Sequence, residues 1–360
     1  MRDDKECVVN DQPNAAEESH GPGRGDLDKT QSMRAVVLDE FGGEFVVREL
    51  PVPVPGPGEI LVRVQASGVN PLDLKIRAGQ AAHARVEPPA VLGIDVAGTV
   101  VQIGEAVTGF RAGDEVYGMT GGIGTSAGSL AEYQVADARL VARKPRAATM
   151  AEAAALPLAV ITAWEGLVDR ANVGSGDSVL IHGGAGGVGY VAVQIALARG
   201  AKVFSTGSGA SLEVIAGLGA TPIDYRNTTA EEYVARHTGG AGFDVIFDTV
   251  GGSTLDASFT AVRRYTGHVV SILGWGTHSL APLSFRGATY SGVFTLLPLL
   301  TGEGREHHGE ILAKIAELVD SGSLRSLLHP DTFGLTEVAD AHDALASRTA
   351  RGKVVVTIGQ

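Results

Sequence analysis

Three glycines in the middle of the chain have the spacing of a phosphate-binding loop. Gly184, Gly186 and Gly189 form the pattern Gly-x-Gly-x-x-Gly. The wholly apolar run 179–181 precedes them and predicts a strand buried on both faces of a parallel sheet. Apolar residues at helical spacing follow and predict a helix over 187–199. A strand, a glycine turn and a helix in this order predict that a dinucleotide pyrophosphate binds the backbone N–H groups at the helix N-terminus.

A tight turn in any βα unit would also use glycines and would bind nothing. A chance match rarely has both flanks correct, so the binding interpretation is favoured. The surrounding sequence supports it, because strands and helices alternate from 178 to 294 and indicate a doubly wound parallel sheet. The predicted strands are 179–181, 201–205, 221–223, 245–247, 269–273 and 289–294. The predicted helices are 187–199, 211–218, 230–237 and 254–263.

The first part of the folded chain is predicted to be a β domain. Many short strands with glycine-rich turns are typical of a compact barrel. These strands are 35–38, 45–47, 60–66, 96–102, 115–117 and 131–135. Helices begin near Thr149, which can form a capping box with Glu152. Near the C-terminus we expect a helix over 308–321 and a last strand over 352–358.

Composition excludes several classes of protein. The chain has 360 residues and a net charge of −12, which argues against a nucleic-acid partner. No apolar run is long enough to span a membrane. Cys7 is the only cysteine, so neither an internal disulfide nor a cysteine zinc site can form. We expect a cytoplasmic protein.

Residues 1–32 have the composition of a disordered tail. Eight acidic and four basic residues occur there, with few apolar ones and no periodicity. Neither a signal peptide nor a transit peptide fits this composition. The natural start is either Met1 or Met33.

Six short motifs resemble those of the medium-chain dehydrogenase/reductase superfamily. They are Pro55-Gly-Pro-Gly-Glu59, Ala66-Ser-Gly-Val-Asn-Pro71, Gly93-Ile-Asp-Val-Ala-Gly98, Gly113-Asp-Glu-Val-Tyr117, the loop 183–189 and Gly352-Lys-Val-Val-Val356. Within the superfamily the chain is most similar to the zinc-independent, zeta-crystallin-like quinone oxidoreductases. The resemblance implies an α/β fold with a Rossmann doubly wound parallel sheet inserted in a GroES-like, β-barrel-type catalytic domain. The expected boundaries are a tail over 1–32, a GroES-like domain over 33–156, a Rossmann NADPH-binding domain over 157–295, and a return to the catalytic domain over 296–360.

The resemblance also indicates that no metal is used. Zinc-dependent relatives have a cysteine where this chain has Asn70, and a histidine–glutamate pair where it has Ile94-Asp95. A catalytic zinc needs thiolate, imidazole or carboxylate ligands in fixed geometry, and this set is incomplete here.

The choice of cofactor depends on the end of the second strand. An NAD site places an acidic residue there, whereas this chain has Ser205-Thr-Gly-Ser-Gly209. Ser205, Thr206 and Ser208 leave room for the 2′-phosphate of NADPH, and Tyr225-Arg226 resembles the family's tyrosine–arginine pair. The family's lysine in the following helix is missing. We expect NADPH.

Further cofactor contacts are implied by the resemblance. For each of these residues, the alternative is a structural role in a turn or in the hydrophobic core. The implied cofactor-binding residues are Thr162, Gly184, Gly186, Gly187, Val188, Gly189, Ser205, Thr206, Ser208, Tyr225, Val250, Leu273, Gly274, Val293, Phe294 and Lys353.

The expected chemistry is hydride transfer, which the cofactor performs. Without zinc, the acceptor must already be reactive. The resemblance places Asn70 and Lys75 in the segment that approaches the nicotinamide, and they are the candidate catalytic residues; Lys75 replaces a common tyrosine of the family. A hydrogen-bond donor there would stabilise the charge that develops on the acceptor oxygen. Asn70 fits equally well as a structural turn residue. No general acid is evident, and His307 and His308 are predicted only to begin a helix.

The leading hypothesis is an NADPH-dependent, zinc-independent reductase of a quinone or an activated alkene. An enal/enone or 2-haloacrylate reductase is the alternative within enzymes. An NADPH-binding structural or nucleic-acid-associated protein is the alternative from another class. Trp275, His83 and the glycine-rich segment 121–124 are candidates for the substrate pocket. The strand 289–294 resembles the edge that members of the superfamily use for sheet pairing, so the resemblance implies a homodimer.

Overall fold

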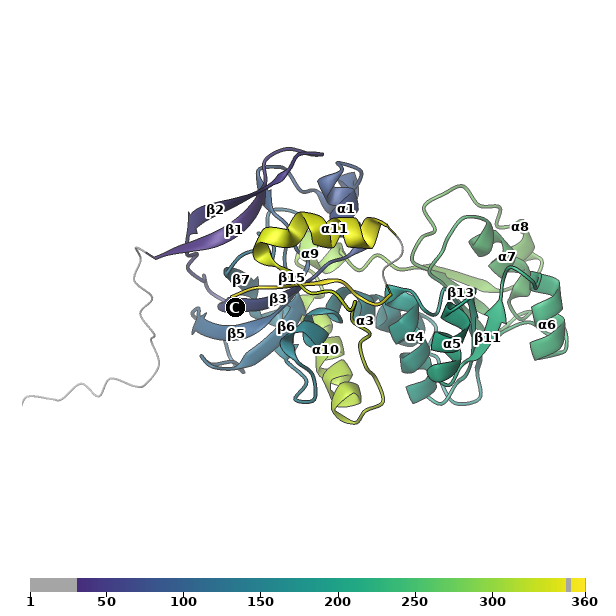
Figure 1. Ribbon diagram of the computed structural model, residues 1–360. Coiled ribbons are helices and arrows are strands. Elements are labelled where there is room, and N and C mark those ends of the chain that lie inside the picture. Colours follow the sequence, from purple (N-terminus) through teal and green to yellow (C-terminus); the bar gives the residue numbers. More distant parts are fainter. Residues whose placement is uncertain (1–30, 348–350, 360) are drawn as a thin grey trace, which may run out of the picture.

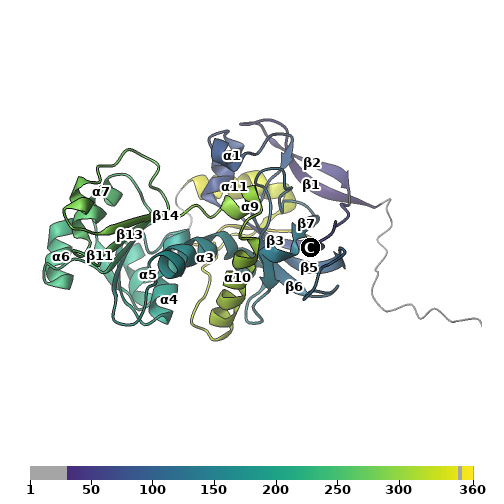
Figure 2. The same cartoon turned by 180° about the vertical axis from the view of Figure 1, so that it is seen from behind.

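A computed structural model describes residues 31–347 and 351–359 and divides into two lobes (Figure 1). One lobe is rich in strands and contains both the start and the end of the described chain. The other lobe is a sheet between layers of helices. Figure 2 shows from behind that α3 and α10 lie where the two lobes meet. The predicted fold class is confirmed.

The nucleotide lobe is built on a six-stranded sheet in which every pairing is parallel. Its strand order is β11-β10-β9-β12-β13-β14. Numbered from the first strand of the lobe this is the order 3-2-1-4-5-6 of dinucleotide-binding sheets. The strand order reverses between β9 and β12, so a ligand crevice is expected at their carboxyl ends. The strands are β9 (Ser178–His182), β10 (Lys202–Gly207), β11 (Thr221–Asp224), β12 (Val245–Asp248), β13 (His268–Ser271) and β14 (Thr289–Gly292).

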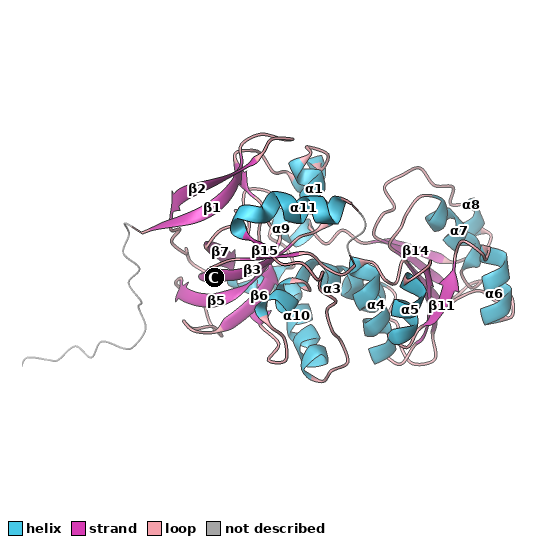
Figure 3. Ribbon diagram, viewed as in Figure 1, coloured by secondary structure: helices cyan, strands magenta, loops and turns pink. Residues whose placement is uncertain are grey.

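Helices cover both faces of this sheet (Figure 3). Val179 and Ile181 belong to the core on the face with α4 and α5, whereas Leu180 packs on the opposite face with the aromatic side chains of α6 and α7. The alternation explains why the strand is apolar throughout. These helices are α4 (Gly187–Ala198), α5 (Ser211–Gly217), α6 (Ala230–Thr238) and α7 (Ser253–Ala261).

The β lobe contains a seven-stranded sheet and a three-stranded sheet. The central strand β3 (Glu59–Gly68) pairs with β5, β7 and β16, so the C-terminal segment returns to the first domain. The remaining strands are β1 (Ser32–Leu38), β2 (Phe45–Pro51), β4 (Ala90–Val91), β5 (Asp95–Ile103), β6 (Glu115–Met119), β7 (Tyr133–Asp137), β8 (Val141–Arg143), β15 (Phe333–Gly334) and β16 (Val355–Thr357).

Several helices join or cover the lobes. α3 (Pro157–Trp164) continues into a π-helical turn, Glu165–Arg170, and α10 (Arg305–Asp320) packs against α3. The others are α1 (Pro71–Arg77), α2 (Met150–Ala154), α8 (Ala281–Ser284), α9 (Leu297–Thr301), α11 (Val338–Ala346) and the short 3-10 turns Ala82–Ala84, Ala138–Leu140 and Leu335–Glu337. The capping box of Thr149 and Glu152 is present at the start of α2.

The predicted tail lies almost wholly outside the described residues. β1 begins at Ser32, which is paired with Pro51. The domain boundaries inside the chain remain predictions, because one apolar core runs through both lobes. Within the described ranges, no helix has the length and apolar character needed to cross a bilayer.

Candidate cofactor and substrate site

The glycine turn between β9 and α4 is shaped by close packing. A Cβ atom at Gly184 would overlap the Ser205 hydroxyl, and one at Gly189 would overlap the carbonyl oxygen of Gly183. Gly183 itself has φ +76°, a conformation that favours glycine. The turn therefore needs glycine at these positions for the strand and the helix to approach each other.

Gly186 and Gly187 have a different role. Both are exposed, and no atom lies within 4 Å of a Cβ built on Gly187. Gly186 is the N-cap of α4 and no side chain caps the helix, so the N–H groups of its first turn face outward. An open approach, free donors and the positive end of a 12-residue helix fit a pyrophosphate.

Two buried side chains hold the turn from below. The Thr206 hydroxyl accepts a hydrogen bond from the Gly183 N–H at 3.2 Å and lies 3.2 Å from Nδ1 of His182. Burial lowers the pKa of His182 to about 4, so the imidazole is neutral near pH 7. The Ser205 hydroxyl donates to the carbonyl of Ile181 at 2.7 Å inside the sheet. Ser205 and Thr206 therefore support the turn, and the hydroxyl of Ser205 is not free for a phosphate.

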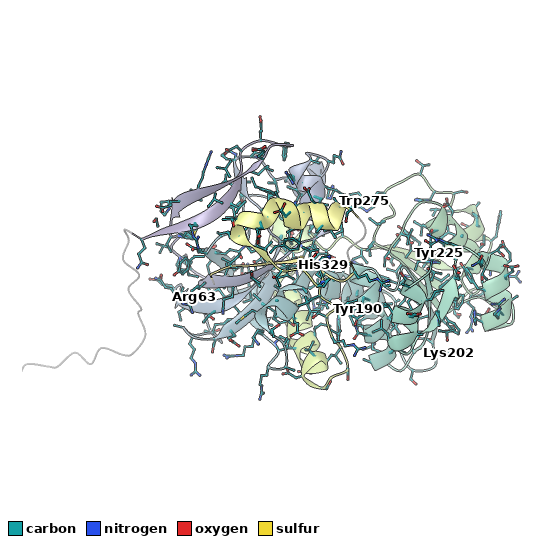
Figure 4. All side chains as sticks on the ribbon, in the orientation of Figure 1. Arg63, Tyr190, Lys202, Tyr225, Trp275 and His329 are labelled. Atoms are coloured by element: carbon teal, nitrogen blue, oxygen red, sulfur yellow. The ribbon has the colours of Figure 1, made fainter. Side chains whose placement is uncertain are left out.

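A polar cluster lies at the carboxyl ends of β10 and β11. The Ser208 hydroxyl donates to the Tyr225 hydroxyl at 3.2 Å, and Tyr225 is 56% exposed. The bond from Ser208, together with Arg226, lowers the pKa of Tyr225. Asp224 is the nearby acidic residue, but its carboxylate accepts bonds from Arg226 N–H and Asn227 in its own turn. Tyr225, which is labelled in Figure 4, and Arg226 are both exposed, so the cluster presents a hydroxyl and a guanidinium to solvent.

A cavity of about 420 Å³ lies at the carboxyl ends of β13 and β14. It is lined by Ser271, Ile272, Gly274, Trp275, Tyr290, Gly292, Val293 and Phe294. Trp275 is labelled in Figure 4, where the two lobes face each other. Its ring lies 4.5 Å from the His83 ring, and Phe294 lies 6.0 Å from the same imidazole. His83 comes from the β lobe, so both lobes form an aromatic wall beside the cavity.

The predicted contacts Gly274, Val293 and Phe294 are all part of this lining. Val250 is exposed just after β12, beside Gly251. A Cβ at Gly251 would press on Leu273, so the turns after β12 and β13 are adjacent. The structure therefore brings the predicted nicotinamide-side residues together at one edge of the sheet.

Asn70 belongs to a buried polar cluster in the β lobe. Its Nδ2 donates to the Asp95 carboxylate at 3.0 Å, and its Oδ1 accepts a bond from the ammonium of Lys353. Asp95 also accepts from the N–H of Leu158 at 2.8 Å. Asn70 is 1% exposed and Asp95 is wholly buried. These contacts agree with the structural alternative for Asn70, because its amide is engaged inside the protein.

Asp73 completes the cluster. It accepts a bond from the Asn70 N–H at 2.8 Å and thereby caps α1, while its second oxygen has no partner among the described residues. Burial raises its pKa to about 7, against the lowering effect of the Asn70 N–H. Burial also raises the pKa of Asp95, whereas Lys353 acts in the opposite direction. Lys353 was expected at the cofactor, and this cluster is where the structure places it.

Lys75 lies apart from the cluster, on the exposed side of α1. Burial of His83, with the positive charge of Lys75, lowers the pKa of this histidine. Lys75 is therefore near the aromatic wall rather than beside Asn70.

Zinc does not fit these residues. Asn70 and Asp95 occupy the expected metal positions, but they hold a lysine ammonium between them. No group of three or more His, Cys, Asp or Glu side chains suited to a metal ion occurs in residues 31–347 and 351–359. Cys7 lies outside these ranges, and metal independence remains a prediction.

A second network was not predicted from the sequence. Thr162 contacts Thr295, Thr295 contacts Glu165, and Glu165 contacts His308. In the sequence, only closeness to predicted cofactor contacts pointed to this network. Thr295 directly follows Phe294, and Glu165 lies three residues after Thr162. His308 was expected to begin a helix. It instead lies inside α10, which begins at Arg305, and is fully buried.

The sheet order, the glycine turn and the cavity beside it define a two-lobed dinucleotide-binding oxidoreductase. Comparison with known proteins gives the family. The alcohol dehydrogenase GroES-like domain matches residues 56–146, and the zinc-binding dehydrogenase family matches residues 218–356. The chain belongs to the medium-chain dehydrogenase/reductase superfamily, whose members use a nicotinamide cofactor.

Two curated relatives and one solved structure span nearly the whole protein. An NADPH-dependent alkenal/one oxidoreductase of Arabidopsis thaliana is 34% identical over 91% of this chain and 80% of its own length. A quinone oxidoreductase of Sus scrofa is 31% identical over 91% and 98%. The structure of an alcohol dehydrogenase superfamily protein from Novosphingobium aromaticivorans is 56% identical, covers 91% of this chain and all of its own, and has a TM-score of 0.89.

Proposed function

We propose that this protein is a zinc-independent, NADPH-dependent reductase that transfers a hydride to a quinone or an activated alkene. The observation that carries the proposal is the aromatic cavity beside the nicotinamide edge of the sheet, next to an open pyrophosphate turn. Bound NADPH would supply the hydride, and the protein would supply orientation and a dry pocket. The names of the alkenal/one and quinone oxidoreductase relatives agree with this chemistry.

The preference for NADPH rests on the cluster after β10 and β11. Ser208 and Tyr225 offer hydroxyl donors, and Arg226 offers a cation for a 2′-phosphate. No acidic side chain occupies the end of β10, where it would bind a 2′-hydroxyl and repel the phosphate. Gly186, Gly187 and the backbone of Val188 would hold the pyrophosphate.

The acceptor would lie against Trp275, Phe294 and His83. Flat aromatic surfaces suit a planar conjugated carbonyl compound. Lys75 would place a positive charge near the acceptor carbonyl, where negative charge develops during reduction. Asn70 and Asp95 would act by holding Lys353 in place on the nicotinamide side.

We also propose a cytoplasmic homodimer that pairs through the free edge of β14. Among the strands that the structure describes, β14 pairs with β13 alone. Exposed aromatic side chains lie beside its start, with Tyr265 85% and Phe285 86% exposed. Both features are typical of a surface that another copy covers.

The test is turnover with a panel of acceptors. Purified full-length protein is mixed with NADPH and with quinones, enals, enones or 2-haloacrylate, and the absorbance of NADPH is followed. Loss of absorbance with quinones or with activated alkenes is expected and identifies the acceptor class. Tight NADPH binding without oxidation by any acceptor would instead indicate the non-enzymatic alternative.

A further inference from the structure

The wall of the cavity at the carboxyl ends of β13 and β14 carries three polar side chains, Ser271, Trp275 and Tyr290. Two of them use their polar atoms inside the protein. The Ser271 hydroxyl donates to Oδ2 of Asp248 at 2.7 Å, and Nε1 of Trp275 donates to the carbonyl of Ile272 at 3.1 Å. The Tyr290 hydroxyl forms no hydrogen bond with any residue that the structure describes. Within this wall it is therefore the side-chain donor that remains free for a ligand.

The ring of Tyr290 is held in place by packing. It meets Phe259 of α7 in an edge contact, with ring centres 5.9 Å apart and an interplanar angle of 88°. Its backbone belongs to β14, where it is paired with Val269 of β13. The side chain thus enters the cavity wall from a strand of the sheet, and a group on such an element is positioned more precisely than one on a loop.

Gly274 makes room for the hydroxyl. A Cβ atom built on Gly274 would lie 2.2 Å from Oη of Tyr290, so any larger residue would push the phenol away. Gly274 does not have a positive φ, and its backbone conformation does not demand glycine. The close approach of the hydroxyl is therefore the reason for glycine at this position of the cavity wall.

The hydroxyl is in its donor form near pH 7. Partial burial, together with the negative charge of Asp248, raises the pKa of Tyr290 above its ordinary value of 10. A quinone or an enone presents a carbonyl oxygen, which only accepts hydrogen bonds, and a neutral phenol can donate one. The carboxamide of a nicotinamide has both donors and an acceptor, so it needs partners of both kinds. A single free donor in an aromatic wall therefore matches the carbonyl acceptor.

We propose that the Tyr290 hydroxyl donates a hydrogen bond to the carbonyl oxygen of the hydride acceptor and stabilises the negative charge that develops there. The proposal rests on the reductase function proposed above. In an enone the hydride forms a bond to the β-carbon, the π electrons shift, and one pair ends on the oxygen as an enolate. The bond from Tyr290 strengthens as this charge grows. The phenol keeps its own proton, and water protonates the enolate.

The test begins with Tyr290→Phe in the full chain, which keeps the ring on Phe259 and removes only the hydroxyl. We expect kcat to fall by roughly 10²-fold with enones and quinones, as for loss of one oxyanion donor. The KM for the acceptor should change much less, because the bond is strongest in the transition state. Tyr133→Phe is the matched control, since Tyr133 is also half-buried but belongs to β7 in the β lobe, and it should leave kcat unchanged.

A double-mutant cycle separates the hydroxyl from general packing. Gly274→Ala should lower kcat, because the new methyl group displaces the phenol. Adding Gly274→Ala to Tyr290→Phe should cost little further activity, since the hydroxyl is gone and the next ring atom, Cζ, lies 3.4 Å from the new Cβ. Tyr290→Phe itself should bind NADPH with the wild-type affinity in a fluorescence titration and should unfold at the wild-type temperature.

Two results would overturn this role of Tyr290. One is a wild-type kcat of Tyr290→Phe with every acceptor that the wild type reduces. The other is a loss of NADPH affinity that accounts for the whole loss of activity, because the hydroxyl would then bind the cofactor. A wild-type protein that reduces no acceptor would contradict the proposed function, and this role with it.

Discussion

Single residues of the glycine turn have separable tasks. Gly184 and Gly189 allow β9, β10 and α4 to pack, because a side chain at either position would overlap neighbouring atoms. Gly187 has open space beyond it, so packing does not require glycine there, and we expect this position to serve the ligand. The sequence alone predicted the turn but could not divide the glycines in this way, since the division depends on which atoms surround each Cα.

The first prediction concerns this open position. In Gly187→Asp the new carboxylate lies in the first turn of α4, where a negative charge is compatible with the helix. The same charge would repel a pyrophosphate, so NADPH binding should be lost while the melting temperature stays close to that of the wild type. Fluorescence titration with NADPH measures the affinity. Gly217→Asp, at an equally open helical glycine in α5, is the control and should bind normally. Tight NADPH binding by Gly187→Asp would refute the site.

The second prediction concerns the phosphate that distinguishes NADPH from NADH. Arg226→Ala should weaken NADPH binding roughly tenfold or more, because a hydrogen bond to a charged group contributes about 1.5–3 kcal/mol. Binding of NADH should change little. Isothermal titration with both cofactors checks this, with Arg236→Ala on the exposed side of α6 as the control. An equal loss for both cofactors would argue against a 2′-phosphate contact.

Most elements of the nucleotide lobe could be predicted from the sequence because their patterns are local. An apolar strand, a glycine turn and an amphipathic helix each have a clear period, and β9, α4 and α6 agree with the prediction to within a residue or so. α1, α3 and α11 were not predicted. α1 begins directly after its N-cap Asn70, whose side-chain partners Asp95 and Lys353 are distant in sequence. α3 is apolar apart from Thr162, and most of its residues are buried.

The helix α11 gives the third prediction, which concerns pH. His342 packs in an edge contact on Phe45, with ring centres 4.9 Å apart, and neither of its ring nitrogens has a hydrogen-bond partner in the described structure. Burial, aided by the charge of Arg77, lowers its pKa from 6.5 to about 4. Between these values the unfolded chain binds a proton that the folded protein does not. The contribution of neutral His342 to the free energy of unfolding is therefore fully present above pH 6.5 and is lost as the pH falls toward 4.

His342→Leu should remove this dependence. Between pH 6.5 and pH 4, the free energy of unfolding of this variant should fall by roughly 3 kcal/mol less than that of the wild type. Urea unfolding at several pH values measures the difference. His307→Leu provides a contrast: partial burial lowers the pKa of His307, but bonds to Asp169 and Glu310 raise it overall. Its contribution is present at low pH and is lost as the pH rises, so its removal should have the opposite sign. Identical pH profiles for His342→Leu and wild type would contradict the first expectation.

At the scale of the whole molecule, the site exists only because two lobes meet. His83 belongs to the β lobe and Trp275 and Phe294 to the nucleotide lobe, yet their rings form one wall. The family resemblance could predict cofactor residues because these residues belong to local motifs, and their contacts with a cofactor stay a prediction. The network of Thr162, Thr295 and Glu165 joins segments 130 or more residues apart, so no local pattern could show it.

The free edge of β14 gives the fourth prediction. Phe285→Glu and Tyr265→Glu place charges on the exposed aromatic surface beside that edge and should convert a dimer to a monomer. Light scattering at micromolar concentration gives the mass of each form. Phe41→Glu, an exposed aromatic in the β lobe, should leave the dimer intact. A wild-type monomer at this concentration would refute the homodimer.

The central claim is direct hydride transfer from NADPH to a conjugated carbonyl acceptor. It can be tested with NADPH that carries deuterium at the transferable position of the nicotinamide ring, an enone acceptor and mass spectrometry of the product. The account predicts one deuterium bound to carbon at the β-position of the reduced enone and none from solvent at that carbon. Reduction that leaves the β-carbon with hydrogen from water, or oxidation of NADPH that yields a reduced enone without deuterium, would contradict it.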